Sequence, residues 1–191
     1  FNFIPKSQSD CEIILHLYTK FGFRKTIMLL DGVFACVLID LNKNITYAAR
    51  DPIGVRAMYL GSNGGDYGFS SELKNLHNLF LNIEQFKSGH IWDSRQQKYE
   101  QYYSCDKIYN NTIVYSNLDT IYKNIRDKFI KAVKKRLMSD RPVGCLLSGG
   151  LDSSLVAALV SKYYTKGKLK TFSVGLKDST DLKYARIVAD F

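Results

Sequence analysis

The side chains best suited to chemistry surround a glycine pair, Gly149-Gly150. Leu146 to Ser154 reads LLSGGLDSS and follows a continuous apolar run. Because glycine has no Cβ, a strand-to-helix turn built from it brings backbone N–H groups close to a ligand. Those N–H groups and the positive end of the helix dipole favour phosphate oxygens. Ser148 and Ser153 add hydroxyl donors, so the loop is predicted to bind the phosphates of a nucleotide.

The carboxylate of Asp152 implies that this predicted site also binds a cation. A carboxylate repels a neighbouring phosphate unless a cation stands between them, so Asp152 predicts a bridging Mg²⁺. The loop has no lysine of the Walker type, which excludes that class of phosphate loop. The alternative is a tight turn in which Asp152 or Ser153 only caps the following helix. The full string in its strand-loop-helix context favours the nucleotide site.

This string resembles the SGGxDS motif of the ATP pyrophosphatases, which cleave ATP between its α and β phosphates to adenylate a substrate. Its longer form is similar to the motif of the asparagine synthetase family. In that family the first leucine of the string and a valine on the next strand hold the adenine nucleotide. The resemblance therefore implies ATP-binding roles for Leu146, Ser148, Gly149, Gly150, Leu151, Asp152, Ser153 and Val174.

A second candidate site lies upstream, in Arg50 to Arg56, which reads RDPIGVR. Its proline and glycine fix a tight turn, and Arg50 offers a planar fork that suits a carboxylate. The segment resembles the RDPLG-x-R loop of the family's glutaminase domain. Ser9 to Glu12 (SDCE) is similar to the segment whose aspartate holds the ammonium group of glutamine. The resemblance implies glutamine-binding roles for Asp10, Arg50, Asp51, Pro52, Ile53 and Gly54. A surface arginine in an exposed turn is the alternative for Arg50.

The glutaminase nucleophile of this family is a cysteine at the mature N-terminus, whose α-amine serves as its base. Residue 1 here is phenylalanine, and Cys11 lies inside the aspartate-bearing motif. No catalytic nucleophile is therefore expected in this segment, and the cysteine is expected before residue 1. We expect the chain to be a piece, truncated at both ends, of a longer enzyme that we call the parent protein. We expect the piece to be inactive alone.

The hydrophobic pattern changes between the two candidate sites. Val33 to Leu41 and Ile45 to Ala49 are strand-like runs separated by a turn, and the first half predicts antiparallel strands with helices. From Val143 onward, strand and helix alternate, which predicts a parallel sheet. The predicted fold class is α+β followed by α/β. A partial glutaminase-type antiparallel α/β sandwich at residues 1–110 would precede the start of a parallel-sheet ATP-pyrophosphatase domain at residues 118–191.

Composition limits the classes of partner. The chain has a formal charge of +9, and 46% of its residues are hydrophobic, as in a globular protein. Much of the charge lies in a predicted amphipathic helix, Lys123 to Arg136, for which a solvated face is favoured over a nucleic-acid patch. With no apolar run of membrane-spanning length and no signal-peptide layout, we expect a cytoplasmic protein without a membrane partner. The dispersed cysteines predict free thiols, and a homodimer is left open.

For the parent protein, the resemblance implies ATP-dependent, glutamine-hydrolysing synthesis of asparagine from aspartate through β-aspartyl-AMP. Its substrates would be glutamine, aspartate and ATP, with Mg²⁺ as the metal. One alternative is a related glutamine amidotransferase acting on another carboxylate, since the acceptor-binding residues are expected after Phe191. An alternative of another class is an RNA-binding or tRNA-modifying protein that uses the same ATP loop. A third is an inactive regulatory remnant.

Overall fold

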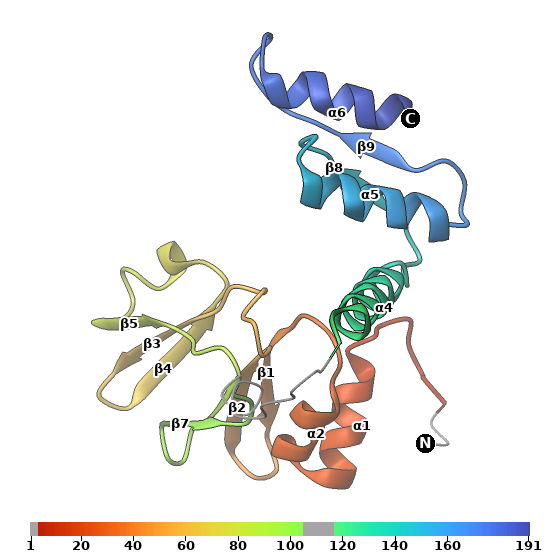
Figure 1. Cartoon of the computed structure of the whole chain (residues 1–191). Coiled ribbons are helices and arrows are strands. Elements are labelled where there is room, and N and C mark those ends of the chain that lie inside the picture. Colours follow the sequence, from red (N-terminus) through yellow and green to blue (C-terminus); the bar gives the residue numbers. More distant parts are fainter. Residues whose placement is uncertain (1–3, 105–116) are drawn as a thin grey trace. The chain divides into compact units, whose positions relative to one another are not determined.

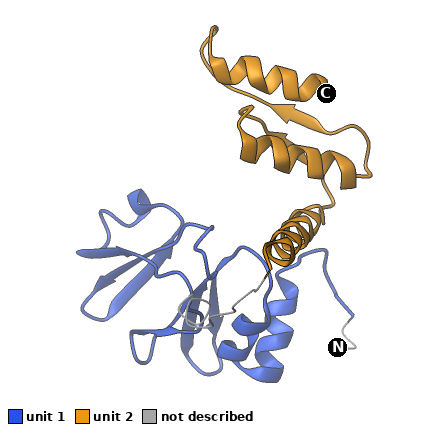
Figure 2. Ribbon diagram, viewed as in Figure 1, with its two compact units in different colours: residues 1–112 blue, residues 113–191 orange. Residues whose placement is uncertain are grey.

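The computed structural model describes residues 4–104 and 117–191, and the chain divides into two compact units. The first unit is residues 1–112 and the second is residues 113–191 (Figure 2). The domain boundary expected between residues 110 and 118 lies in a polar region that includes Cys105. Residues 105–116 of this region fall outside the described residues. No helix in the described part of the chain is both long and apolar enough to cross a membrane.

The first unit begins with two short helices and continues with antiparallel strands (Figure 1). Gly22 separates the helices: its φ of 76° lies in the left-handed region, and its N–H donates to the Tyr18 carbonyl. The sequence suggests Gly22 as a helix stop, and the structure confirms it, although a second helix follows at once. The described elements of this unit are α1 Glu12–Phe21, α2 Phe23–Leu29, β1 Ala35–Asp40, β2 Ile45–Arg50, β3 Tyr59–Asn63, β4 Asp66–Ser70, η1 Leu73–Asn75, β5 Asn82–Gln85, β6 His90–Asp93 and β7 Lys98–Gln101.

Two antiparallel sheets form the body of the first unit. One has the strand order β1-β2-β6-β7 and the other the order β4-β3-β5. Because successive side chains point to opposite faces of a strand, the neighbours Ala48 and Ala49 enter different cores. Ala49 packs with Phe23 and Ile27 of α2, whereas Ala48 packs with Trp92 and residues of the second sheet. The larger sheet is therefore covered by helices on one face and by the smaller sheet on the other.

The described part of the second unit contains a parallel pair of strands and three helices, labelled in Figure 1. Its described elements are α4 Leu118–Arg136, β8 Gly144–Leu146, α5 Leu151–Tyr163, β9 Lys170–Phe172 and α6 Thr180–Asp190. The predicted parallel pairing is confirmed, with Leu146 beside Phe172. Val133 of α4 enters the core, together with residues of β8, α5 and α6. The sequence predicts one buried apolar stripe along α4, made of Ile121, Ile125, Phe129, Val133 and Leu137. Phe129, Val133 and Leu137 do pack with the core, but Ile125 is 61% exposed.

Some local expectations were wrong. The sequence predicts a five-residue turn at residues 61–65, but β3 and β4 pair up to Asn63 and Asp66, so only Gly64-Gly65 turns the chain. Strand β5 and helix α2 were not anticipated at all. Asn82 to Gln85 is exposed apart from Ile83 and shows no apolar alternation, so the local pattern does not predict a strand there. The strand forms because this segment pairs with β3.

Candidate functional sites

The first candidate site is the loop that leaves the end of β2, Arg50 to Arg56, called here the first glycine loop. Arg50 is only 6% exposed, and its side chain turns into the loop. Its Nε donates to the Arg56 carbonyl at 2.7 Å, Nη1 to the Phe86 carbonyl at 2.7 Å and Nη2 to the Gly54 carbonyl at 2.6 Å. These bonds use three of the five N–H donors of the guanidinium group.

Asp51 is more deeply buried, with 1% of its surface exposed. Its carboxylate accepts hydrogen bonds at 2.7–3.3 Å from the backbone N–H groups of Phe34, Ile53, Gly54, Val55 and Arg56. Burial acts to raise the pKa of Asp51, but the loop N–H donors outweigh it and hold the pKa below its usual value. Asp51 is therefore an ionised, fully enclosed anchor of the loop.

Gly54 is required by this arrangement. Its φ is +74°, and a Cβ there would lie 3.0 Å from both the guanidinium carbon of Arg50 and the Cβ of Ser88. Side chains of the loop instead point outward, since Ile53 is 73% exposed and Val55 is 58% exposed. The loop therefore turns its peptide groups inward and its apolar side chains outward.

This geometry differs from the arrangement that the sequence suggests. The sequence suggests that the Arg50 fork faces the carboxylate of a ligand, but here the fork is occupied by backbone carbonyls. Asp51 likewise presents no oxygen to a ligand, because its carboxylate is enclosed by N–H donors. Local sequence could not reveal this, since one acceptor of Arg50 belongs to Phe86, 36 residues away.

Asp10 lies elsewhere in the unit, directly before the first turn of α1. It is exposed, and the Cys11 thiol lies 3.7 Å from its Oδ1. Beside it is an open apolar cavity of about 660 Å³, lined by residues of the N-terminal segment, α1 and β1. No residue of the first glycine loop is among the described residues that line this cavity. Asp10 and Arg50 are thus not brought together in one pocket.

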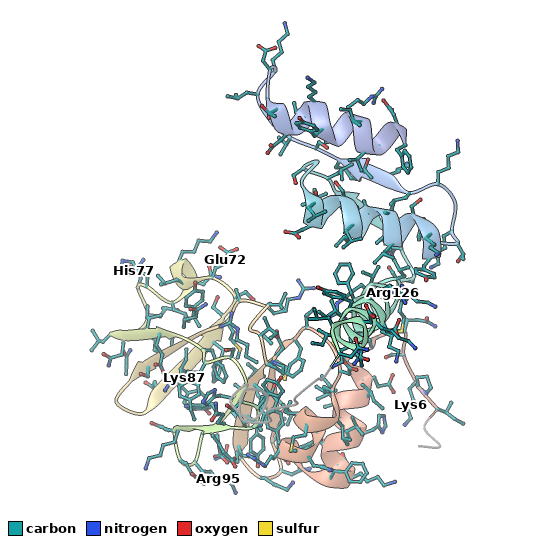
Figure 3. The ribbon with its side chains drawn as sticks, viewed as in Figure 1. Lys6, Glu72, His77, Lys87, Arg95 and Arg126 are labelled. Atoms are coloured by element: carbon teal, nitrogen blue, oxygen red, sulfur yellow. The ribbon has the colours of Figure 1, made fainter. Side chains whose placement is uncertain are left out.

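Ser9-Asp10-Cys11-Glu12 has the sequence spacing of a capping box, but both side chains have other partners in the structure. The Ser9 hydroxyl accepts a bond from Cys11 N at 3.2 Å, while Glu12 reaches further back. The Glu12 carboxylate accepts from the N–H groups of Lys6 and Ser7 at 2.7–3.1 Å and from the Ser7 hydroxyl. These donors, with the Ser7 hydroxyl the strongest, lower the pKa of Glu12 to about 2. The segment that carries Lys6 is thereby tied to the start of α1 (Figure 3).

The second candidate site is Ser148 to Ser153, called here the second glycine loop. It connects β8 to α5, as the sequence predicts. The Ser148 and Ser153 hydroxyls lie 2.9 Å apart, and Ser153 also accepts a bond from Ser148 N at 3.3 Å. Ser153 and Ser154 both donate to the Gly150 carbonyl. In the described structure the N–H groups of Gly149, Leu151 and Asp152 have no hydrogen-bond acceptor, and they lie at or beside the start of a helix.

Gly149 fixes this loop against α6. Its φ is +80°, and a Cβ there would lie 2.4 Å from the backbone N of Ala185. Ala185 itself is 3% exposed and belongs to the core of the unit. Gly150 differs, because its φ is not positive and a Cβ would meet only the Ser148 hydroxyl, at 3.5 Å. Packing against α6 therefore requires a glycine at position 149, whereas there is room for a Cβ at Gly150.

An apolar cavity of about 310 Å³ adjoins the second glycine loop. Its walls include Leu146 and Val174, which are 83% and 96% exposed, together with Phe172. Ser148 and Ser153 line the same cavity. Exposed apolar side chains beside hydroxyls and free N–H groups suit a ligand with a flat apolar ring and an anionic tail.

Asp152 lies in the first turn of α5 and is exposed. The described residues contain no group of three or more side chains that could hold a metal by themselves. A single exposed carboxylate beside a phosphate-binding loop fits Mg²⁺, which takes one or two protein carboxylates and completes its shell with phosphate oxygens and water. Asp152 is therefore a residue of this loop whose side chain could hold Mg²⁺.

Sequence reasoning missed two residues of the second site. The Ser173 hydroxyl donates to the Leu147 carbonyl at 2.5 Å and so joins the ends of β9 and β8 beside the cavity. Phe172 forms a wall next to Leu146. The signal was available, because Phe172 and Ser173 directly precede Val174 on a predicted strand.

Two family models match different parts of the chain. Residues 2–78 match the family model of a glutamine amidotransferase domain, and residues 124–191 match that of asparagine synthase. Asparagine synthetase [glutamine-hydrolyzing] 1 of Lotus japonicus is 42% identical over 97% of this chain and 33% of its own length. The Homo sapiens asparagine synthetase [glutamine-hydrolyzing] is 40% identical over 100% of this chain and 39% of its own length.

The chain spans about a third of the length of these relatives. Among solved structures, the glutamine phosphoribosylpyrophosphate amidotransferase from B. subtilis, complexed with ADP and GMP, matches with a TM-score of 0.48. That match has 18% identity and covers 95% of this chain and 45% of the other.

Proposed function

The chain belongs to the family of glutamine-hydrolysing asparagine synthetases, and from that premise we propose that the parent protein makes asparagine from aspartate. ATP would supply the energy and glutamine the nitrogen. The first unit would belong to the glutaminase part and the second unit to the part that uses ATP. Glutamine, aspartate and ATP are accordingly the proposed substrates.

The observation that carries this proposal is the second glycine loop with the cavity beside it. The loop combines unpaired N–H groups, two hydroxyls and a helix N-terminus, which together favour a polyphosphate. The adjoining walls, Leu146 and Val174, are apolar and almost fully exposed, which suits the two faces or the edge of an adenine ring. An adenine nucleotide provides both parts in one molecule.

In the proposed reaction, the β-carboxylate of aspartate attacks the α-phosphorus of ATP, and pyrophosphate leaves. The free N–H groups of Gly149, Leu151 and Asp152 and the Ser148 and Ser153 hydroxyls would hold the departing pyrophosphate oxygens. Asp152 would hold Mg²⁺, which when bound offsets negative charge on the phosphates. Ammonia then displaces AMP from β-aspartyl-AMP to give asparagine.

The first unit would provide the ammonia by hydrolysing glutamine. Asp10 is exposed beside a cavity and is proposed to hold the ammonium group of glutamine. The first glycine loop is proposed to support the same site, although its Arg50 and Asp51 are occupied by backbone groups. The nucleophile would be the N-terminal cysteine expected upstream.

The experiment that tests this function is Asp152→Ala in the parent protein. We expect aspartate-dependent release of pyrophosphate from ATP to fall by at least about 100-fold, because the metal would lose its protein ligand. Hydrolysis of glutamine should continue, since it does not involve ATP phosphates. Asp140→Ala, on an exposed residue of the same unit, is the matched control and should change neither activity. Unchanged pyrophosphate release in Asp152→Ala would refute the assignment.

A further inference from the structure

We propose that Arg50 and Asp51 form a buried, charge-balanced clamp on the backbone of loop Pro52 to Arg56, and that both are positioning residues rather than ligands for glutamine. The inference deepens the proposed function, on which it rests, because it concerns how the glutaminase unit holds one of its loops. It also predicts that a substitution of Arg50 does not discriminate between glutamine and an analogue without the α-carboxylate.

The clamp holds two loop residues, Gly54 and Arg56, through both their N–H and their carbonyl groups. Asp51 accepts the N–H of Gly54 and the N–H of Arg56, while Arg50 donates to the carbonyls of those same two residues. Ile53 and Val55 between them also donate N–H bonds to Asp51. Because each loop peptide is held through its backbone, the loop conformation depends on both charges and little on its own side chains.

The opposite charges of Arg50 and Asp51 offset part of the free-energy cost of burying each of them. An isolated buried ion is costly, and Arg50 and Asp51 are 6% and 1% exposed. They are adjacent and opposite in sign, so the enclosed site has no net charge. No ion pair joins them among the described residues: each charge is instead satisfied by peptide dipoles of the loop. Gly54 completes the fit, since any Cβ would press on the guanidinium group.

The clamp also joins distant parts of the unit. Asp51 N donates to the Phe34 carbonyl at 2.8 Å, and the Asp51 carbonyl accepts a bond from Gly89 N at 3.0 Å. Arg50 reaches the Phe86 carbonyl, and the Tyr102 hydroxyl donates to the Arg50 carbonyl at 2.8 Å. Segments before β1, before β6 and after β7 therefore all converge on two residues.

A substrate comparison in the parent protein separates positioning from direct binding. Arg50→Lys is assayed with glutamine and with 4-aminobutanamide, which is glutamine without its α-carboxylate. If Arg50 positions the loop, kcat/KM falls by the same factor for both, and their ratio stays within about threefold of wild type. If Arg50 binds the α-carboxylate, the loss falls on glutamine alone, by roughly 10–100-fold, and the proposal is overturned. Arg24→Lys, on an exposed cation of α2, is the control.

Hydrogen–deuterium exchange tests the clamp without requiring activity. In Asp51→Asn the amides of residues 53–56 should exchange at least about tenfold faster, because an amide cannot replace a carboxylate that accepts five N–H bonds. Asp66→Asn, an exposed position in β4, should leave them unchanged. If Asp51→Asn does not fold, Arg50→Lys takes its place in the same measurement, with faster exchange again expected. Unchanged exchange overturns the clamp, whereas a wild-type parent without glutaminase activity refutes only the proposed function.

Discussion

The two glycine loops of this chain use their backbone groups in opposite ways. In the first, peptide N–H and carbonyl groups point inward onto Asp51 and Arg50, and the apolar side chains face outward. In the second, N–H groups beside the start of α5 remain without acceptors in the described structure, and hydroxyls provide the local contacts. The first loop is thus arranged as a scaffold around its own buried charges, whereas the second loop, with its free donors, is proposed to receive a ligand.

The two glycines of the second loop give the largest expected difference. Gly149→Ala should lower the free energy of unfolding by about 2–5 kcal/mol, because the new Cβ meets the α6 backbone and φ is positive. Gly150→Ala should change it by less than about 1 kcal/mol, since a Cβ fits there. Denaturant unfolding of the parent protein and its variants measures both. Equal effects of the two substitutions would contradict the packing described for Gly149.

Two glycines of the first unit, Gly54 in the first glycine loop and Gly32 outside it, offer a similar comparison. Gly54→Ala should destabilise by about 1–3 kcal/mol, because the Cβ would touch the Arg50 guanidinium group at a positive φ. Gly32→Ala is the control: nothing lies within 4 Å of its Cβ position and its φ is not positive. Thermal unfolding compares them. A Gly54→Ala protein as stable as the control would mean that the loop is not held as tightly as described.

The sequence predicts the second loop better than the first, and the reason is physical. Strand, loop and helix in residues 144–163 are contiguous, so apolar pattern and the glycine pair predict them, and the structure confirms them. The partners of Arg50 and Asp51 come from residues such as Phe34 and Phe86, which are distant in the chain. Local propensity carries no information on such contacts. The ATP- and glutamine-binding roles themselves stay predictions.

The pH dependence of stability should report the buried carboxylate. Asp51 has a pKa below its usual value in the folded protein, so the unfolded chain takes up a proton first as pH falls. Its stabilising contribution is complete above the unfolded pKa of about 4 and is lost as pH falls through the folded pKa. Asp51→Asn should therefore be destabilised at pH 7 and lose less further stability between pH 5 and pH 2.5. Parallel pH curves for the two proteins would contradict the anchor.

The smallest expected effect concerns the two cysteines beside the cavity in the first unit. Burial raises the pKa of the Cys36 thiol to about 11, whereas Cys11 is exposed. Because the thiolate is the reactive form, iodoacetamide at pH 8 should label Cys11 well before Cys36. Peptide mapping by mass spectrometry measures the two rates, with denatured protein as the control. Faster labelling of Cys36 would show that β1 opens in solution.

The contrast between a scaffold loop and a receptor loop is tested most directly by hydrogen–deuterium exchange of the parent protein with and without MgATP. Our account predicts that MgATP slows exchange in peptides covering residues 146–154, where free N–H groups would gain acceptors. Peptides covering residues 50–56 should show the same exchange in both conditions, because their N–H groups are already bonded to Asp51. Unchanged exchange at 146–154, or equal protection of both loops, would contradict the account.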